Sequence, residues 1–327
     1  MADWTVRAEN KSIGITARRE TMTKKRKKVT IHKVTIALCL ITTMTVLNGC
    51  GTGNKIVIGA QTFTETKILA EMYKALIEDR TDVSVEIIPD LASSPVVLQA
   101  IIRGDLQMGT LYSGEIFNKH FPIQNTKDRK KVLEQAQTGF NKYYDLKWMN
   151  PLGFENTYAF TVREEVAQAK GYEKISDIKP DAKNMRLGVD TSWLERSTDG
   201  YPAFSKYYGI TFGTIFPMEL SLVYKAATQN QVDIVLAYST DSRLKAYKLK
   251  TLKDDKHFFP PYDASTVMRN DAAKKHPDAA AAVSELIGTI NVETMIDLNY
   301  EVDMEKKSER EVALAYLKRV GLLKSKG

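Results

Sequence analysis

The hydrophobic positions of the chain follow two alternating periods. Short runs rich in β-branched and apolar residues are typical of strands, and the stretches between them carry apolar residues every three or four positions, as amphipathic helices do. The alternation of strand-like and helix-like stretches begins at residue 55, and a second series of predicted strands begins at residue 186. The pattern predicts strands at residues 55–60, 83–88, 106–112, 186–190, 214–218 and 232–238.

Residues that favour helix ends mark the predicted helices. Thr62 and Glu65 have the spacing of a capping box ahead of an apolar helical run. Pro95 opens a second helix that ends at Gly104, because proline suits the first helical turn and glycine the position after the last. Further helices are predicted at residues 126–143 and in the C-terminal segment that Ser308 caps.

Strands that alternate with helices predict an α/β fold with largely parallel sheets. In such sheets, ligands bind beyond the carboxyl ends of the strands. Gln61, Tyr112 and Tyr238 each end or follow a predicted strand, so they are candidates for a ligand site. The 277 residues after Cys50 are enough for one core to divide into two.

The first fifty residues have the pattern of an export signal. A basic cluster at residues 24–28 precedes an apolar run of about 14 residues, shorter than the ~20 that a membrane span needs. The run ends in Leu-Asn-Gly-Cys, which resembles a bacterial lipobox and implies cleavage before Cys50 and diacylation of its sulfur. We therefore expect a signal segment at residues 1–49, in which Met22 is a possible true start, and a lipidated tether at 50–54. A transmembrane anchor is the alternative.

The charge and the cysteine content of the remaining chain differ from those of the whole sequence once residues 1–49 are excluded. Residues 1–49 hold ten of the 47 Lys and Arg residues and three of the 40 Asp and Glu residues, which leaves 37 of each sign. The high isoelectric point therefore gives no support to nucleic-acid binding. Cys39 and Cys50 are the two cysteines, so we expect no disulfide and no cysteine metal site.

Catalytic motifs are missing from the sequence. There is no glycine-rich phosphate loop, no HExxH and no GxSxG, and the histidines after Cys50 lie far apart. We expect no enzyme activity, no metal and no cofactor. A lipid-anchored α/β enzyme stays open as an alternative, because catalytic groups need not be neighbours in sequence.

Five blocks of sequence match one known family in the same order. They are residues 153–160, 186–193, 199–201, 233–241 and 252–262. Over residues 55–320 the chain resembles the glycine betaine/carnitine/choline-binding lipoproteins of osmoprotectant ABC importers. The resemblance implies a two-lobed, type II-like periplasmic-binding-protein fold whose chain crosses twice between lobes, near 156–160 and 260–264, with the ligand in the cleft. Lobe 1 would comprise 55–157 plus 263–327, and lobe 2 would comprise 158–262.

The family's site, by resemblance, is a cage of tyrosines around a trimethylammonium group. Such a group has no N–H to donate, whereas aromatic faces attract it through their quadrupole. The resemblance also implies two polar positions that hold the other end of the ligand or brace the cage. By motif, the cage positions are Tyr112, Tyr158, Tyr238 and Tyr262, and the polar positions are Gln61 and Asn156.

Glu115, three residues after Tyr112, is expected to bear on selectivity. A carboxylate beside the cage would repel the carboxylate of betaine or carnitine and would suit choline, unless it points to solvent or pairs with a base.

The resemblance implies a monomeric receptor, anchored by lipid to the outer face of the cell membrane, that delivers its ligand to an ABC permease and its ATPase. One alternative is a receptor for another amine or an amino acid, which would need carboxylates in the cleft. Another is a lipoprotein that senses or adheres without a permease.

Overall fold

The computed structural model describes residues 54–195 and 200–323, all of which belong to one compact unit, Gly53–Gly327. The predicted signal segment, Cys50 and most of the tether lie outside the described residues. Within the described part of the chain, no helix is both long and apolar enough to cross a membrane.

The first of two five-stranded sheets has the order β2-β1-β3-β10-β4. β1 pairs in parallel with β2 and β3, while β10 runs antiparallel to both of its neighbours. We call the part of the chain built around this sheet lobe 1. Its strands are β1 (Lys55–Gln61), β2 (Ser84–Leu91), β3 (Met108–Tyr112), β4 (Leu146–Glu155) and β10 (Asp263–Arg269).

The second sheet repeats this plan with the order β7-β6-β8-β5-β9. β6 pairs in parallel with β7 and β8, and β5 runs antiparallel to β8 and β9. We call the part built around it lobe 2. The expectation of largely parallel sheets holds for all but one strand of each sheet. The strands of lobe 2 are β5 (Tyr158–Arg163), β6 (Arg186–Val189), β7 (Thr214–Pro217), β8 (Ile234–Tyr238) and β9 (Leu249–Thr251).

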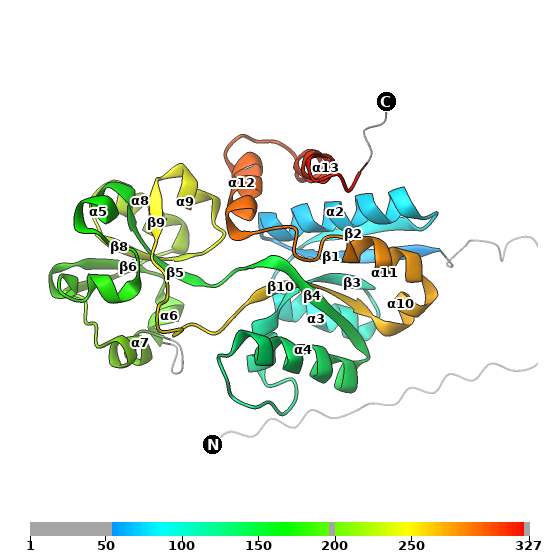
Figure 1. The fold of residues 1–327 in the computed structure, drawn as a ribbon, viewed down its shortest axis with the longest axis horizontal. Helices are drawn as coiled ribbons and strands as arrows, with labels where there is room; N and C mark the ends of the chain where they lie inside the picture. The colour runs from blue at the N-terminus through cyan, green and yellow to red at the C-terminus, as the bar shows by residue number, and fades with distance from the viewer. Residues whose placement is uncertain (1–53, 196–199, 324–327) are drawn as a thin grey trace, which may run out of the picture. The chain divides into compact units, whose positions relative to one another are not determined.

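The chain passes from one sheet to the other twice. β4 leads into β5 through residues 156–157, and residues 252–262 lead from β9 back to β10 (Figure 1). The two passages are joined where the Asn156 amide N–H donates to the Tyr262 carbonyl at 3.0 Å. Each antiparallel strand is therefore the strand that arrives from the other sheet.

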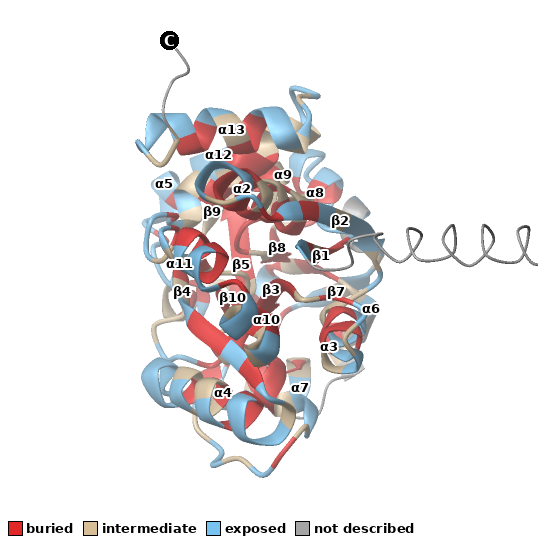
Figure 2. Cartoon of the chain, turned by 90° about the vertical axis from the view of Figure 1, so that its right-hand side faces the viewer, coloured by how far each residue is buried: buried red, intermediate tan, exposed pale blue. Residues whose placement is uncertain are grey.

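Helices flank both sheets, and their inner faces form the cores with the central strands (Figure 2). Lobe 1 and the C-terminal segment contain α2 (Thr64–Arg80), α3 (Ser94–Arg103), α4 (Arg129–Tyr144), α10 (Asn270–Lys275), α11 (Pro277–Ser284), α12 (Val292–Asp303) and α13 (Glu309–Arg319). Lobe 2 contains α5 (Glu164–Lys170), α6 (Thr191–Glu195), α7 (Tyr201–Tyr208), α8 (Leu220–Thr228) and α9 (Ser242–Ala246). Short 3₁₀ helices lie at η1 (Ser113–Asn118), η2 (Ile175–Ile178) and η3 (Ala182–Asn184).

The cores of the lobes differ in composition. Lobe 1 packs mainly aliphatic residues of β1, α2 and the C-terminal helices, among them Ile56, Ile68 and Leu76. Lobe 2 packs aromatic rings, with Trp193 completely buried against Phe160 and Phe204. Trp193 thus belongs to the aromatic core of lobe 2.

The predicted strands and helices are present, with ends shifted by a few residues. Asp128 caps α4 and Ser308 caps α13, and Gly104 ends α3 in the left-handed conformation with φ 87°. The pattern missed β4, β5, β9 and β10. In β4 the hydrophobic alternation is broken at Pro151, which the sheet tolerates because β4 is an edge strand.

The predicted capping box at the start of α2 is wrong. The N-cap is Phe63, no side chain caps the helix, and Glu65 lies within its first turn. The Glu65 carboxylate instead accepts hydrogen bonds from residues that are distant in the sequence. Tertiary partners therefore replace the local backbone interaction that the motif suggested.

Candidate ligand-binding site

A cavity of about 530 Å³ brings together five of the predicted site residues. They come from β3, η1, the two passages between the sheets and the end of β8. Tyr158 and Gln61 do not line this cavity, although each touches a residue that does. The five lining residues are Tyr112, Glu115, Asn156, Tyr238 and Tyr262.

Lobe 1 contributes Tyr112 and Tyr262, which lie beside each other through strand pairing. Tyr112 ends β3 and pairs with Ala264 of β10, two residues after Tyr262. The Tyr262 ring lies against Gly114, where a side-chain Cβ would come within 2.3 Å of the ring. Only a glycine at position 114 leaves room for the ring in this place.

Lobe 2 contributes Tyr238 and Tyr158, which pair directly. Tyr158 begins β5 opposite Tyr238 at the end of β8, and their rings stack with centroids 5.1 Å apart and an interplanar angle of 21°. The Tyr158 ring also packs against Phe259 of the aromatic core, with ring centroids 5.9 Å apart. Packing against the core thus orients the Tyr158 ring, and that ring in turn supports Tyr238.

The two pairs occupy equivalent places in the two sheets. In each sheet one tyrosine ends the third strand of the order, β3 or β8, and the other stands at the start of the arriving antiparallel strand, β10 or β5. The strand-end rule therefore places all four tyrosines where the two sheets face the passages between them.

Glu65 is a buried residue of this cavity whose role the sequence did not suggest. Its side chain is 2% exposed, accepts a hydrogen bond from the Tyr112 hydroxyl, and accepts another from Asn156 Nδ2 at 3.0 Å. Burial raises the pKa of Glu65. Hydrogen bonds from neighbouring side chains, of which Thr240 has the largest effect, offset part of this rise. Burial and then the Glu65 charge raise the pKa of Tyr112 well above 10, so its hydroxyl stays a donor.

The two predicted polar residues have different surroundings. Asn156 lies in the first passage and connects Glu65 with the backbone of Tyr262. Gln61 is buried at the end of β1 and accepts a hydrogen bond from the Ser94 hydroxyl at 3.2 Å. Because Ser94 lines the cavity, Gln61 lies one residue behind the cavity wall.

Glu115 lies in η1 and is buried in the cavity wall rather than pointing to solvent. It accepts a hydrogen bond from Asn118 Nδ2 at 2.9 Å, and His120 Nε2 lies 3.6 Å from the same carboxylate oxygen. Asn118 thus holds the Glu115 carboxylate, and the base His120 lies beside it without a hydrogen bond to it.

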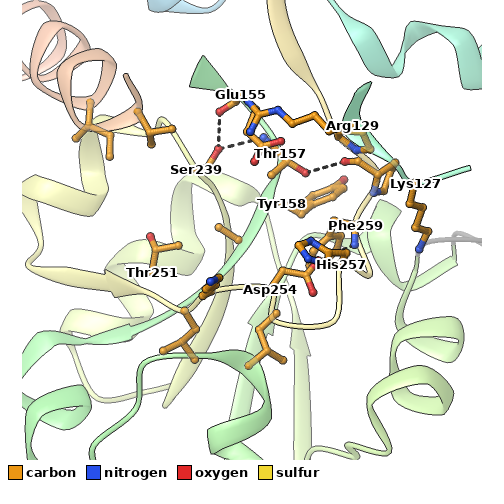
Figure 3. Close-up of a pocket in the computed structure, with 18 of the residues that line it drawn as sticks. Lys127, Arg129, Glu155, Thr157, Tyr158, Ser239, Thr251, Asp254, His257 and Phe259 are labelled. Carbon is orange, nitrogen blue, oxygen red and sulfur yellow. Dashed lines mark hydrogen bonds between the residues drawn. The ribbon is translucent and has the colours of Figure 1, made fainter. Parts of the chain in front are cut away.

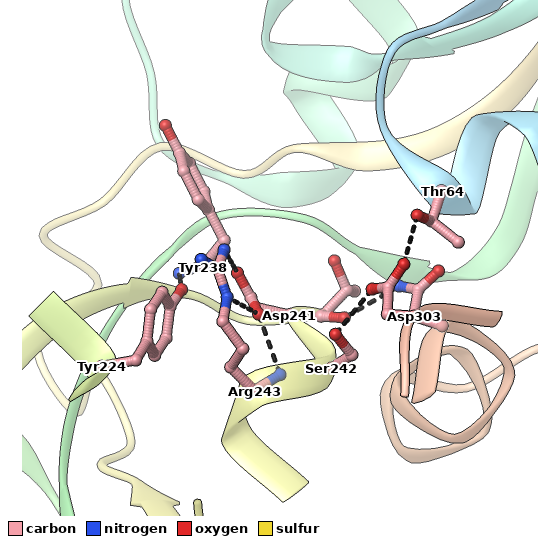
Figure 4. A network of polar contacts seen from close by, with 9 residues as sticks. Thr64, Tyr224, Tyr238, Asp241, Ser242, Arg243 and Asp303 are labelled. Carbon is pink, nitrogen blue, oxygen red and sulfur yellow. Dashed lines mark hydrogen bonds and ion pairs between the residues drawn. The ribbon is translucent and has the colours of Figure 1, made fainter. Parts of the chain in front are cut away.

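A polar network that includes lining residues of both lobes lies at the cavity (Figure 4). The Arg243 guanidinium lies 4.2 Å from the centroid of the Tyr224 ring and donates to Asp241 at 2.8 Å. Asp303 of α12 accepts from the Thr64 hydroxyl of lobe 1 and from the Ser242 hydroxyl of lobe 2, each at 2.6 Å. One carboxylate therefore joins the two lobes at the cavity.

A second cavity of about 680 Å³ contains Tyr158 and Phe259 among several charged side chains (Figure 3). Most of those charges have partners within the protein. Arg129 donates to Asp263 at 2.7 Å, Lys127 donates to the Phe258 carbonyl, and Asp254 accepts from the Phe259 amide at 2.8 Å. These groups stabilise the second passage, so the smaller cavity, with three predicted tyrosines, is the candidate ligand site.

The protein-family model for the substrate binding domain of the ABC-type glycine betaine transport system matches residues 54–319. The chain belongs to this family. The family resemblance found in the sequence is thereby confirmed, and so are the α/β class and the two-lobed periplasmic-binding fold with two crossings.

Individual relatives support the assignment. The carnitine transport binding protein OpuCC of Listeria monocytogenes is 41% identical over 276 residues, covering 84% of this chain and 90% of the relative. The ergothioneine transport permease/ergothioneine binding protein EgtU of Helicobacter pylori is 35% identical over 223 residues, covering 68% of this chain and 40% of the relative. A crystal structure of a glycine betaine/carnitine/choline ABC transporter protein superposes with a TM-score of 0.79 at 39% identity, covering 82% of this chain and 99% of that one.

Family membership establishes the general role. The protein is an extracytoplasmic substrate-binding protein of an ABC transport system of the glycine betaine, carnitine and choline class, and it is not an enzyme. Sequence reasoning missed several polar residues of the cavity because they are far apart along the chain and come together only in the assembled fold. They are Glu65, Thr240, Arg243, Asn299 and Asp303.

Proposed function

We propose that the protein binds a quaternary-ammonium osmoprotectant (choline, glycine betaine or carnitine) in the 530 Å³ cavity and delivers it to an ABC importer. The observation that supports this proposal is the position of four tyrosines at equivalent strand ends of the two sheets. Such an arrangement presents aromatic faces from both lobes to one ligand.

The expected binding energy fits this class of receptor. A desolvated contact between a cation and an aromatic face contributes about 2 kcal/mol. The three rings that line the cavity would contribute on the order of 6 kcal/mol before ordering costs. A micromolar dissociation constant corresponds to roughly −8 kcal/mol, so we propose that closure of the lobes adds contact with the fourth ring, Tyr158. Neutral rings also discriminate against small, strongly hydrated cations, which keep their water.

Within this class we propose choline as the preferred ligand. Glu115 is buried in the cavity wall, and a buried carboxylate there would repel the carboxylate of betaine or carnitine. Choline carries a hydroxyl in place of that carboxylate and avoids the repulsion. Ergothioneine, named for the Helicobacter relative, is also a trimethylammonium compound with a carboxylate, so Glu115 would disfavour it in the same way.

Isothermal titration calorimetry of the purified protein tests the proposal. The ligands are choline, glycine betaine, carnitine and ergothioneine, with proline and spermidine as compounds that lack a trimethylammonium group. We expect micromolar binding of at least one trimethylammonium ligand, which Tyr158→Ala and Tyr238→Ala each weaken strongly. Tyr143→Ala is the matched control, because Tyr143 is 49% exposed and stacks on Phe121 away from the cavity. A folded protein that binds none of these trimethylammonium ligands contradicts the proposal.

Delivery requires that the receptor stays at the membrane and recognises its permease in the closed form. Ligand that contacts both lobes binds the closed form better and shifts the population toward it. We propose two acyl chains at Cys50 as the anchor, since one chain holds only marginally. Cys50→Ala is expected to move the protein from the membrane fraction to the medium or periplasm, and fractionation with mass spectrometry of the N-terminal peptide measures this.

A further inference from the structure

Glu65 is a buried carboxylate that no positively charged side chain of the described residues neutralises. The Tyr112 hydroxyl and the Asn156 side-chain amide, both neutral donors, reach the same oxygen, Oε1. The neutral side chains of Thr240 and Asn299 also lie beside the carboxylate. In the described part of the chain, Oε2 is buried without a hydrogen-bond partner. Arg243 lines the same cavity, but its guanidinium is paired with Asp241.

A buried carboxylate of this kind is unfavourable in the empty protein. Removal from water penalises the charged form unless an opposite charge or several hydrogen bonds compensate it. Burial raises the pKa of Glu65 accordingly. The position at the start of α2 and the neutral side chains around the carboxylate compensate only part of this penalty, since burial stays the largest influence on the pKa of Glu65. A cation held in the cavity would supply the rest.

We propose that the Glu65 carboxylate determines specificity for a charged ligand, so that the cavity prefers a cation to an uncharged molecule of the same shape. This inference rests on the proposed function, because it concerns the same cavity and the same ligand class.

Two physical effects connect Glu65 with a bound cation. The first is direct attraction, which is strong where the surroundings exclude water. The second acts through Tyr112, whose hydroxyl donates to Glu65. A phenol that donates to a carboxylate gains negative charge on its ring, and a more negative ring face attracts a cation more strongly. Asn156 fixes the carboxylate from the first passage, so the charge has a defined position.

The test compares choline with 3,3-dimethyl-1-butanol, in which a carbon atom replaces the charged nitrogen and the shape is kept. Titrations use the full-length protein in detergent and its Glu65→Gln variant. In the unsubstituted protein we expect choline to bind about 100-fold more tightly than the alcohol, and Glu65→Gln to reduce this ratio about tenfold. Glutamine keeps an oxygen that can accept from Tyr112, so the fold is retained.

Two further variants serve as controls. Glu71→Gln makes the same chemical change on the same helix, where Glu71 forms a half-exposed ion pair with Arg310 at 3.1 Å, and it leaves the ratio unchanged. Glu65→Asp keeps the negative charge. The preference for choline over the alcohol should therefore fall less in this variant than in Glu65→Gln, even if the shorter side chain lowers the affinity for both ligands.

The outcomes separate this inference from the proposed function. If Glu65→Gln weakens both ligands by the same factor, or leaves the ratio unchanged, Glu65 has only a structural role and the inference is overturned. If the alcohol binds too weakly to measure, choline affinity decides. A loss of about tenfold with the free energy of unfolding unchanged or raised supports the inference, and unchanged affinity overturns it. If the unsubstituted protein binds no trimethylammonium ligand, the proposed function itself has failed.

Discussion

The tyrosine pairs of the two lobes stand at equivalent strand ends, yet the protein holds them in different ways. In lobe 1, Tyr112 is 6% exposed, belongs to the hydrophobic core and donates to a buried carboxylate. In lobe 2, Tyr158 and Tyr238 are half-buried, stack on each other and rest on the surface of an aromatic core. Tyr262, the other tyrosine of lobe 1, is half-buried and lies against Gly114. The same topology therefore holds Tyr112 by burial and the lobe 2 pair by stacking.

This difference separates two ways in which a site can be prepared before the ligand arrives. A ring fixed in the core loses little freedom when it binds, so its contribution to affinity is largely preorganised. A half-buried ring gains part of its contacts only when the ligand and the other lobe cover it. We infer that lobe 1 provides the fixed wall and lobe 2 the wall that closes on the ligand.

The largest expected effect is a difference in stability between the two pairs. Tyr112→Ala removes a buried ring and leaves the Glu65 carboxylate without one donor, so the free energy of unfolding should fall by about 3–5 kcal/mol. Tyr238→Ala should lower it by about 1 kcal/mol, although both variants lose ligand affinity. Urea denaturation, followed by calorimetry of the folded fraction, measures both. Equal losses of stability would mean that the two walls are held alike.

The second prediction concerns the other ring of lobe 1. Gly114→Ala places a Cβ where it would lie within 2.3 Å of the Tyr262 ring, so the ring must move from the cavity wall. Affinity for a trimethylammonium ligand should fall about 10- to 30-fold, the contribution of one aromatic contact. In a Tyr262→Ala background the same change should have almost no further effect. An additive loss in the double variant would show that Gly114 acts by another route.

The third prediction addresses selectivity on the lobe 1 side. Glu115→Thr removes a carboxylate from the cavity wall, so betaine affinity should rise relative to choline by about tenfold. The ratio of the two dissociation constants, measured by competition calorimetry, reports this change. An unaltered ratio would indicate that Glu115 serves only its contacts with Asn118 and His120.

The smallest expected effect is on pH dependence. The raised pKa of Glu65 means that the empty folded protein binds a proton more strongly than the unfolded chain does. Stability of the empty protein therefore gains from Glu65 as the pH falls from neutral through this raised pKa, whereas cation binding weakens because the carboxylate loses its charge. Glu65→Gln should flatten both dependences and stabilise the empty protein at neutral pH. Thermal unfolding and calorimetry between pH 4.5 and 8, roughly spanning carboxylate and histidine titration, measure them.

Other groups near Glu65 titrate or carry charge, so the comparison with Glu65→Gln is needed to isolate its contribution. The Tyr112 hydroxyl and the neutral Asn156, Thr240 and Asn299 surround it. Glu115, Asp241, Arg243 and Asp303 line the same cavity. A variant that keeps the full pH dependence of binding would assign that dependence to one of these carboxylates.

The sequence predicted the strand ends well because hydrophobic periodicity is a local property. Tyr112 and Tyr238 could be chosen as candidates from their place after an apolar run, and the structure puts both in the cavity. Tyr158 and Tyr262 depended on the family resemblance, since β5 and β10 gave no signal in the hydrophobic pattern. The lobe boundaries and the roles of all seven predicted residues stay predictions.

Glu65 shows why the remaining part of the site could not be predicted. Its spacing from Thr62 matched a capping motif, which is a local explanation and a sufficient one for a sequence read alone. Its real partners, Tyr112 and Asn156, are 47 and 91 residues away. Asp303 is similar, because it joins Thr64 and Ser242 across 239 and 61 residues. Contacts of this range depend on the assembled fold.

The central position of β10 in the first sheet has a consequence for the order in which the protein assembles. β10 lies between β3 and β4, so β4 has no neighbour in that sheet until residue 269 is available. All strands of the second sheet lie between residues 158 and 251, a continuous stretch. During synthesis the N-terminal residues of the chain become available first. Lobe 2 can then complete its sheet while lobe 1, although its first strands are made earlier, still lacks β10. We therefore expect lobe 1 to complete its sheet after lobe 2.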